Sequence, residues 1–207
     1  MKRSAVFHKV LAAVCVLIIL TGLVLQWRSI GVWLESQGDG VLARSLQFVS
    51  WFTVLTNLLC GCCCLRIVFG KTLPDRSFMA VPCAAILTVC LVAAFVLKSP
   101  GDLKAIARTA DLLLHYGSPP FFIGLWWLCP ASKHFRRPII MAAGYAIGYA
   151  SWIFLRGGIL GFYPYPFVDP AFRGLTSAVA HVLIMFVLYG AILAILLLVS
   201  SNKADAS

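Results

Sequence analysis

The feature that most constrains this chain is a series of six apolar segments, each about as long as the 17–25 residues that an α-helix needs to cross a bilayer. They are residues 10–27, 48–69, 78–97, 111–128, 139–155 and 175–200. Hydrophobic residues make up 61% of the 207 residues and charged residues only 12%, which excludes a soluble domain. We therefore predict an all-α, integral membrane bundle of six transmembrane helices that forms a single domain over residues 1–207.

The first apolar segment follows a basic leader that contains Lys2, Arg3 and Lys9. A secretory signal peptide has a similar beginning. However, residues 25–28 (LQWR) offer no small residues for cleavage, and the apolar stretch is long. We therefore expect a retained first helix.

Basic residues are distributed unevenly between the two sets of connecting segments. With six crossings, the termini and the second and fourth loops carry ten basic and two acidic residues, whereas the other loops carry seven basic and five acidic residues. Because positively charged loops stay in the cytoplasm, both termini are predicted to lie inside. The net charge of +10 is spread over the loops, so we interpret it as topology and lipid-headgroup charge and expect no nucleic-acid partner.

Two local patterns predict packing rather than chemistry. Residues 99–102 (SPGD) have the sequence of a helix start, and apolar residues then recur at helical spacing over 103–110. We expect a short amphipathic helix there, lying on the membrane surface. Gly144 and Gly148 have the spacing of a close-packing motif and are expected to seat neighbouring helices.

Seven of the eight cysteines lie inside apolar segments or at their edges, where cysteine behaves as a small hydrophobic residue. The cluster at residues 60–64 (CGCCC) would suit a metal ion or S-acylation. No histidine has ligand spacing to this cluster. We therefore expect no metal and no cofactor.

Three polar side chains, Thr53, Thr56 and Asn57, lie near the start of the second segment. Their spacing places them on one face of a helix. An unpaired hydroxyl or amide in hydrocarbon costs several kcal/mol, so this face is expected to point into the protein. Thr53 is predicted to lie about seven residues into its helix, roughly 10 Å from the start.

Ionisable side chains in two other segments are predicted at a similar depth on the outer side. Burial of such groups in a membrane is costly, which makes them functional candidates. His115 is the first of these, with a hydrogen bond to a carbonyl group as its structural alternative. Asp111, one turn earlier, could orient the imidazole, although we favour a role at a helix N-terminus, where the dipole stabilises a carboxylate. His181 is interpreted as a packing or supporting residue, with direct involvement as the alternative.

Residues 156–174 are rich in aromatic residues and proline and show no helical period. We predict that they form an interfacial loop or lid on the outer side. Tyr163, Tyr165 and Asp169 are its candidate substrate-binding or lid residues.

The common catalytic motifs are absent from the sequence, including the Gly-x-Ser-x-Gly elbow, His-Glu-x-x-His and the P-loop. The chain has only seven acidic residues, which disfavours two-metal and glycosidase chemistry. These residues could support a threonine or serine nucleophile that a histidine activates. Its substrate would arrive from the lipid or from the outer interface.

Short motifs in several segments resemble those of one family of membrane proteins. They are Phe52-Thr53, His115 with Pro120, and Gly144 with Trp152 and residues 163–167 (YPYPF). The family is the androgen-induced-gene family of multipass membrane hydrolases, and its bacterial six-helix relatives are more similar still. Its animal members hydrolyse fatty acid esters of hydroxy fatty acids with a threonine and a histidine.

The resemblance implies that Thr53 is the nucleophile, that His115 is the base, and that the chain resides in a bacterial inner membrane. The chain departs from some animal members at two positions. Leu112 stands where they have a further histidine, and Asn57 where they have a carboxylate. These departures concern the polar surroundings of the pair and so affect the identity of the substrate.

The leading hypothesis is an integral membrane enzyme that hydrolyses a lipid ester. Thr53 would attack the ester carbonyl, His115 would accept its proton, and Asn57 would donate to the oxyanion. This mechanism requires the hydroxyl and the imidazole to lie within about 3–5 Å of each other. The alternative is a non-catalytic protein, such as a small transporter, a lipid-binding protein or an assembly partner, in which the same residues form a binding or packing network.

Overall fold

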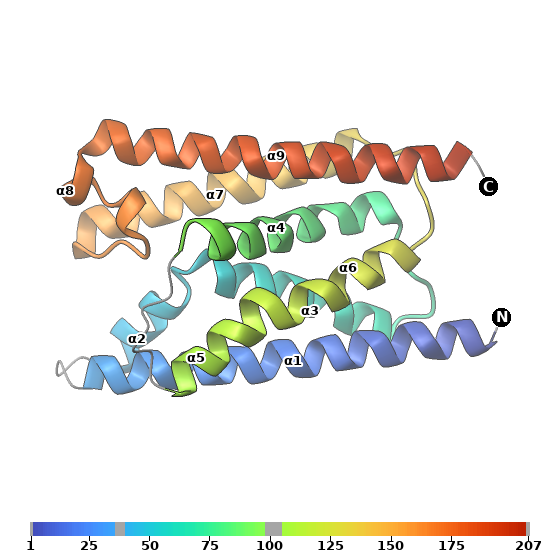
Figure 1. Ribbon diagram of the computed structural model, residues 1–207, viewed down its shortest axis with the longest axis horizontal. Coiled ribbons are helices and arrows are strands. Elements are labelled where there is room, and N and C mark those ends of the chain that lie inside the picture. The colour runs from blue at the N-terminus through green and yellow to red at the C-terminus, as the bar shows by residue number, and fades with distance from the viewer. Residues whose placement is uncertain (1, 36–39, 98–104, 206–207) are drawn as a thin grey trace.

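The computed structural model describes residues 2–35, 40–97 and 105–205, and every regular element in these ranges is a helix. The elements are α1 (Lys2–Glu35), α2 (Val41–Phe48), α3 (Phe52–Phe69), α4 (Arg76–Phe95), α5 (Ala105–Leu112), η1 (Leu113–Gly117), α6 (Ser118–Leu128), α7 (Arg136–Leu160), η2 (Pro166–Val168), α8 (Pro170–Arg173) and α9 (Leu175–Asp205). The long helices lie side by side along one axis (Figure 1). The predicted all-α fold is confirmed.

Five helices in the described part of the chain are long and apolar enough to cross a membrane. Their apolar spans are Val6–Val32, Phe52–Phe69, Arg76–Phe95, Arg136–Leu160 and Leu175–Ala204. Large apolar side chains point away from the bundle; Phe95, for example, is 82% exposed. Such a surface is stable in lipid rather than in water. The five helices are therefore consistent with a multipass integral membrane protein.

The fourth apolar segment belongs to a helical run that is interrupted by a π-helical turn. Residues 105–128 form α5, then the five-residue π-helix η1, then α6. The described part of the expected amphipathic helix is α5, which packs along α1 and continues into η1. Gly22 in α1 allows this approach, since a Cβ atom there would lie 2.6 Å from Leu114. Residues 99–102 lie outside the described residues.

Several predicted boundaries are wrong. The helix α1 extends to Glu35 and α2 follows it, so the expected first loop is largely helical where it is described. A turn at residues 49–51 delays the start of α3 to Phe52. Hydropathy marks the length that hydrocarbon requires, whereas helical hydrogen bonding continues until a residue such as Gly161, at φ 67°, ends it.

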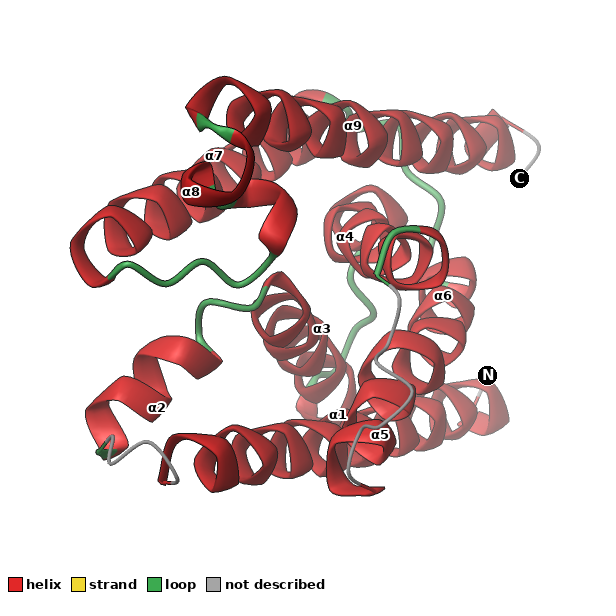
Figure 2. Ribbon diagram, turned by 60° about the vertical axis from the view of Figure 1, so that its left-hand side comes forward, coloured by secondary structure: helices red, strands yellow, loops and turns green. Residues whose placement is uncertain are grey.

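The helices form three layers. The helices α3, α4 and α6 lie in the middle, α1 lies on one side, and α7 and α9 lie on the other (Figure 1, Figure 2). Large buried side chains such as Phe122, Ile19 and Met79 fill the core. Cys60, Cys63 and Cys64 are buried there as small groups. Within the described residues, no three His, Cys, Asp or Glu side chains gather closely enough to hold a metal.

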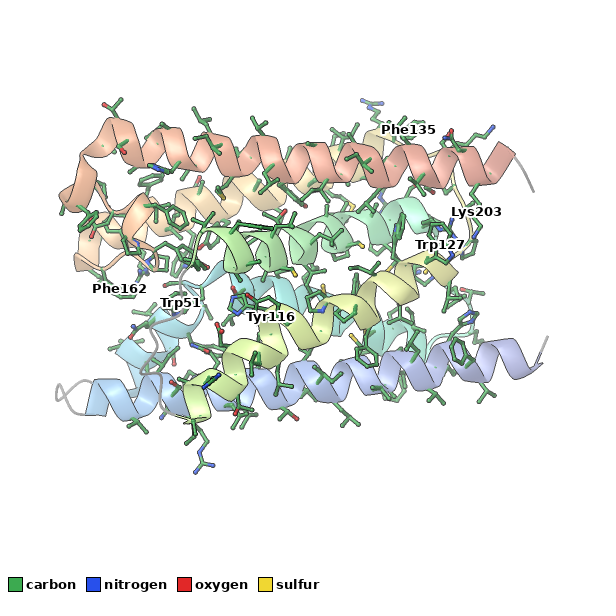
Figure 3. The ribbon with its side chains drawn as sticks, viewed as in Figure 1. Trp51, Tyr116, Trp127, Phe135, Phe162 and Lys203 are labelled. Carbon is green, nitrogen blue, oxygen red and sulfur yellow. The ribbon has the colours of Figure 1, made fainter. Side chains whose placement is uncertain are left out.

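The beginning of α1 and the end of α9 lie at the same end of the bundle (Figure 1). Trp127 and Lys203 lie towards this end, whereas Trp51 and Phe162 lie towards the other (Figure 3). The Nζ atom of Lys203 is 4.4 Å from the centre of the Trp127 ring. Aromatic and basic residues at the helix ends suit the two lipid–water interfaces.

Candidate functional site

Thr53 and His115 lie in direct contact at the start of α3. The hydroxyl Oγ1 of Thr53 is 3.0 Å from Nε2 of His115. The depth expected for Thr53 is wrong, because α3 begins at Phe52 and Thr53 therefore belongs to the first turn. The preceding turn fixes this start, since the N–H groups of Val54 and Leu55 both donate to the carbonyl oxygen of Trp51.

His115 is the middle residue of the π-helix η1. A π turn is a rare conformation that often occurs at functional sites. Nδ1 of His115 is 3.0 Å from the carboxylate Oδ1 of Asp111 and 3.1 Å from its carbonyl oxygen. Both neighbours accept hydrogen bonds, so Nδ1 carries the hydrogen of the neutral ring. Nε2 is then free to accept the hydroxyl hydrogen of Thr53.

Asp111 therefore contacts the imidazole ring. The favoured prediction, a carboxylate at a helix N-terminus, is wrong because α5 begins six residues earlier, at Ala105. The helix dipole acts only within the first turn and does not account for Asp111. The side chain of Asp111 is 27% exposed, compared with 13% for His115. The carboxylate thus lies on the side of His115 that is nearer the surface.

Asn57 ties α3 to the π turn. Its amide nitrogen donates to the carbonyl oxygens of Thr53, at 2.9 Å, and Leu114, at 3.2 Å. Its oxygen accepts from the hydroxyl of Ser118 at 2.6 Å. Both amide hydrogens are thereby used, so Asn57 braces Thr53 and His115 rather than donating to an oxyanion in this structure. Sequence reasoning missed Ser118, three residues after His115 in an apolar segment.

Thr56, the third polar residue on this face of α3, meets α7 instead. Its hydroxyl lies 2.9 Å from that of Tyr145. Tyr149 donates to the carbonyl oxygen of Ser50, and Trp152 donates to that of Val49, so the same helix holds the turn before α3. The three α7 residues were not predicted as site residues. Their spacing of four and three along the fifth apolar segment is the signal that could have identified them.

Tyr165 covers the beginning of α3. Its hydroxyl oxygen accepts a hydrogen bond of 3.2 Å from the backbone N–H of Phe52. Its ring packs edge-on against Trp51 and stacks on Phe167. Burial raises the pKa of Tyr165, and hydrogen bonding with the side chain of Thr53 opposes that rise. The phenol therefore lies beside the Thr53 hydroxyl in its neutral form.

The remaining predicted residues contact other partners. Tyr163 packs against Gly157, where a Cβ atom would lie 2.4 Å from the tyrosine ring. Asp169 caps α8 by accepting from the N–H of Ala171. His181 places Nδ1 2.7 Å from the carbonyl oxygen of Ser177, and its ring centre is 6.0 Å from that of Phe167. It thus contacts Phe167, which in turn stacks on Tyr165.

A mainly apolar cavity of about 80 Å³ has Thr53, but not His115, among its lining residues. It is lined by Phe52, Thr53, Thr88, Val89, Val92, Leu97, Ala146, Tyr149, Ala150, Ile153, Tyr165, Phe167, Val168, Val182, Met185, Phe186 and Tyr189. The space is several times the roughly 10–15 Å³ that one buried water needs. A hydroxyl at the boundary between an imidazole and an apolar cavity suits an apolar substrate with one reactive polar group.

Comparison of the chain with protein-family models, with characterised proteins and with solved structures finds no match.

Proposed function

We propose that the chain is an integral membrane hydrolase of lipid esters, similar in chemistry to the androgen-induced-gene family. Thr53 is the nucleophile and His115 the general base, and Asp111 orients the imidazole. One observation carries the proposal: Asp111, His115 and Thr53 form a continuous series of contacts of 3.0 Å that ends at an apolar cavity. Nucleophile, base and orienting group stand in the order that covalent ester hydrolysis uses on unrelated folds.

In the first half of the reaction, Oγ1 of Thr53 bonds to the ester carbonyl carbon while Nε2 of His115 takes the hydroxyl proton. The tetrahedral intermediate then collapses, the bond to the alcohol oxygen breaks, and His115 returns the proton to the leaving alcohol. Water attacks the acyl-threonine with His115 again as base, which releases the fatty acid and restores Thr53. Asp111 stabilises the imidazolium in both halves.

The oxyanion requires a hydrogen-bond donor other than Asn57. We assign that role to the hydroxyl of Tyr165, which accepts from the Phe52 N–H and keeps its own hydrogen to donate. It lies beside Thr53, where the carbonyl carbon would be attacked. The assignment also gives the predicted lid loop a function, because Tyr165 belongs to it.

We propose six crossings with both termini in the cytoplasm, in the inner membrane of a bacterium. Residues 105–128 provide the sixth crossing, since α5, η1 and α6 have 8, 5 and 11 residues in one run. The two ends of the chain lie at the same end of the bundle, which supports an even number of crossings (Figure 1). Tags at either terminus are expected to be digested by protease only after the cytoplasmic side is opened, and digestion in intact cells would overturn the orientation.

The test of the activity is labelling by a fluorophosphonate probe in native membranes. The unmodified protein is expected to label, and Thr53→Val to lose the label while keeping its expression level. Thr56→Val is the matched control, because it removes a buried hydroxyl from the same helix that contacts Tyr145 instead of His115. Equal labelling of all three proteins, or of none, would favour the non-catalytic alternative, in which the cavity only binds lipid.

A further inference from the structure

We infer that the acyl chain of the ester lies in a groove between α7 and α9 and reaches Thr53 from the bilayer through that groove. The inference rests on the proposed function, whose substrate it specifies as a long-chain acyl ester. The groove has a volume of about 420 Å³. Its lining includes Ala143, Ala146, Phe186, Tyr189, Gly190 and Ala194.

The groove exists because small side chains face each other where the two helices run together. Ala143 on α7 and Gly190 and Ala194 on α9 leave the space between the helices unfilled. A Cβ atom added at Gly190 would meet no atom within 4 Å. Both helices instead pack on α4, so the groove stays open on the outer side of the bundle. An acyl chain in the membrane can therefore enter it sideways.

The groove adjoins the cavity beside Thr53. Ala146, Phe186 and Tyr189 line both spaces. The hydroxyl of Tyr189 donates to the carbonyl oxygen of Val81 in α4. This bond directs the hydroxyl of Tyr189 towards α4. The ring of Tyr189 then forms an apolar wall where the groove and the cavity meet.

The length and chemistry of the adjoining spaces fit a hydrocarbon chain. On α7 the lining extends from Ile139 to Ile153, which corresponds to about 21 Å at 1.5 Å per residue. Among the described residues, no charged side chain lines either space, and Tyr189 is the one hydroxyl-bearing residue that lines the groove. A headgroup would be left without hydrogen-bond partners there, whereas a hydrocarbon chain needs none.

A second copy of this chain is the competing occupant, and a different face of α7 is better suited to it. A Cβ atom added at Gly144 or Gly148 would meet no described atom within 4 Å, so the expectation that these glycines seat neighbouring helices is wrong for the described chain. Both are exposed and lie outside the groove lining. The groove adjoins the cavity that Thr53 lines. A helix of a second copy packed in the groove would have no use for that cavity.

The first experiment compares nitrophenyl hexadecanoate with nitrophenyl butanoate in detergent micelles. Gly190→Leu fills the groove and is expected to lower hexadecanoate hydrolysis at least tenfold relative to butanoate hydrolysis, with fluorophosphonate labelling of Thr53 retained. Gly148→Leu is the matched control and is expected to leave the ratio unchanged. An unchanged ratio in Gly190→Leu with intact labelling would overturn the groove while leaving the hydrolase proposal in place.

The second experiment requires no catalysis. A hexadecanoic acid with a photoactivatable diazirine near its end is expected to crosslink to groove residues in membranes, and Gly190→Leu is expected to reduce this crosslinking at least fivefold. Gly148→Leu should crosslink like the unmodified protein. Crosslinking that Gly190→Leu leaves unchanged would overturn the inference, whether or not the protein hydrolyses an ester.

Discussion

Thr53 Oγ1 and His115 Nε2 lie 3.0 Å apart, although 62 positions separate the two residues in the chain. Asn57 holds this contact by hydrogen-bonding to the backbone on both sides of it. With the ring hydrogen on Nδ1, the hydroxyl hydrogen of Thr53 faces the lone pair of Nε2. The predictions below test this contact, its supports and the turn that creates it.

If the two side chains act as one unit, removing either should lower the rate of hydrolysis nearly as much as removing both. Thr53→Val and His115→Ala are each expected to lower kcat for ester hydrolysis by about 10²–10⁴-fold. The kcat of the double variant should be no lower than that of the less active single variant. Initial rates on a nitrophenyl ester in micelles provide the measurement. Additive losses would show that the residues act separately.

Asp111→Asn removes the charge that faces His115 while keeping the size of the side chain. We expect kcat to fall about 10–100-fold with little change in KM, because the imidazolium loses its counter-charge in the transition state while the Asp111 carbonyl oxygen still holds Nδ1. Asp169→Asn, which alters only the cap of α8, is the control and should retain full activity. Equal activity of the two variants would show that Asp111 does not contribute to the reaction and that Thr53 and His115 act as a dyad.

Asn57→Ala should destabilise the fold, because it removes the amide hydrogen bonds to the carbonyl oxygens of Thr53 and Leu114 and leaves the hydroxyl of Ser118 with its longer bond of 3.3 Å to Leu114. The expected loss in the free energy of unfolding is about 1–3 kcal/mol. Denaturant unfolding in micelles can measure it, with Thr109→Ala on the exposed side of α5 as the control. A variant as stable as the unmodified protein would show that Asn57 is not a brace.

The π turn places His115 in register with Thr53. Deletion of Tyr116, which is 42% exposed, is expected to convert η1 into an α-helical turn and to rotate His115 by about 100° relative to α6. Helicity by circular dichroism should remain, whereas labelling of Thr53 should disappear. Tyr116→Ala keeps the residue count and is expected to label normally, so loss in both variants would count against the register argument.

Tyr165→Phe removes the proposed oxyanion donor without changing the size of the ring, and kcat should fall about 10²-fold. Burial raises the pKa of Tyr165 above its ordinary value near 10, so the phenol is neutral and its contribution should be constant from about pH 6 to 9. Because the pKa of Tyr165 is higher in the folded than in the unfolded protein, the unfolded phenol loses its proton first as the pH rises, and this favours unfolding. The unmodified protein should therefore lose stability relative to Tyr165→Phe only above about pH 10, as thermal unfolding can show.

The sequence by itself determined which parts of the chain are apolar helices and which polar side chains those helices carry. Helical spacing placed Thr53, Thr56 and Asn57 on one face, and hydropathy identified the segments, because both properties depend on neighbouring residues alone. The boundaries were less accurate. A helix continues past the hydrocarbon for as long as its backbone hydrogen bonds are satisfied, as α1 and α7 do.

The tertiary structure alone decided what the polar groups meet. Asn57 turned from an expected oxyanion donor into a brace because Leu114 and Ser118 lie across from it. Asp111 lies one helical turn before His115, so the spacing allowed the contact, and the structure shows that the two side chains meet. Periodic patterns did not reveal the π turn in which His115 lies. Hydrogen-bond partners from distant segments are set by the packing of whole helices, which depends on small residues such as Gly22 that let two backbones approach.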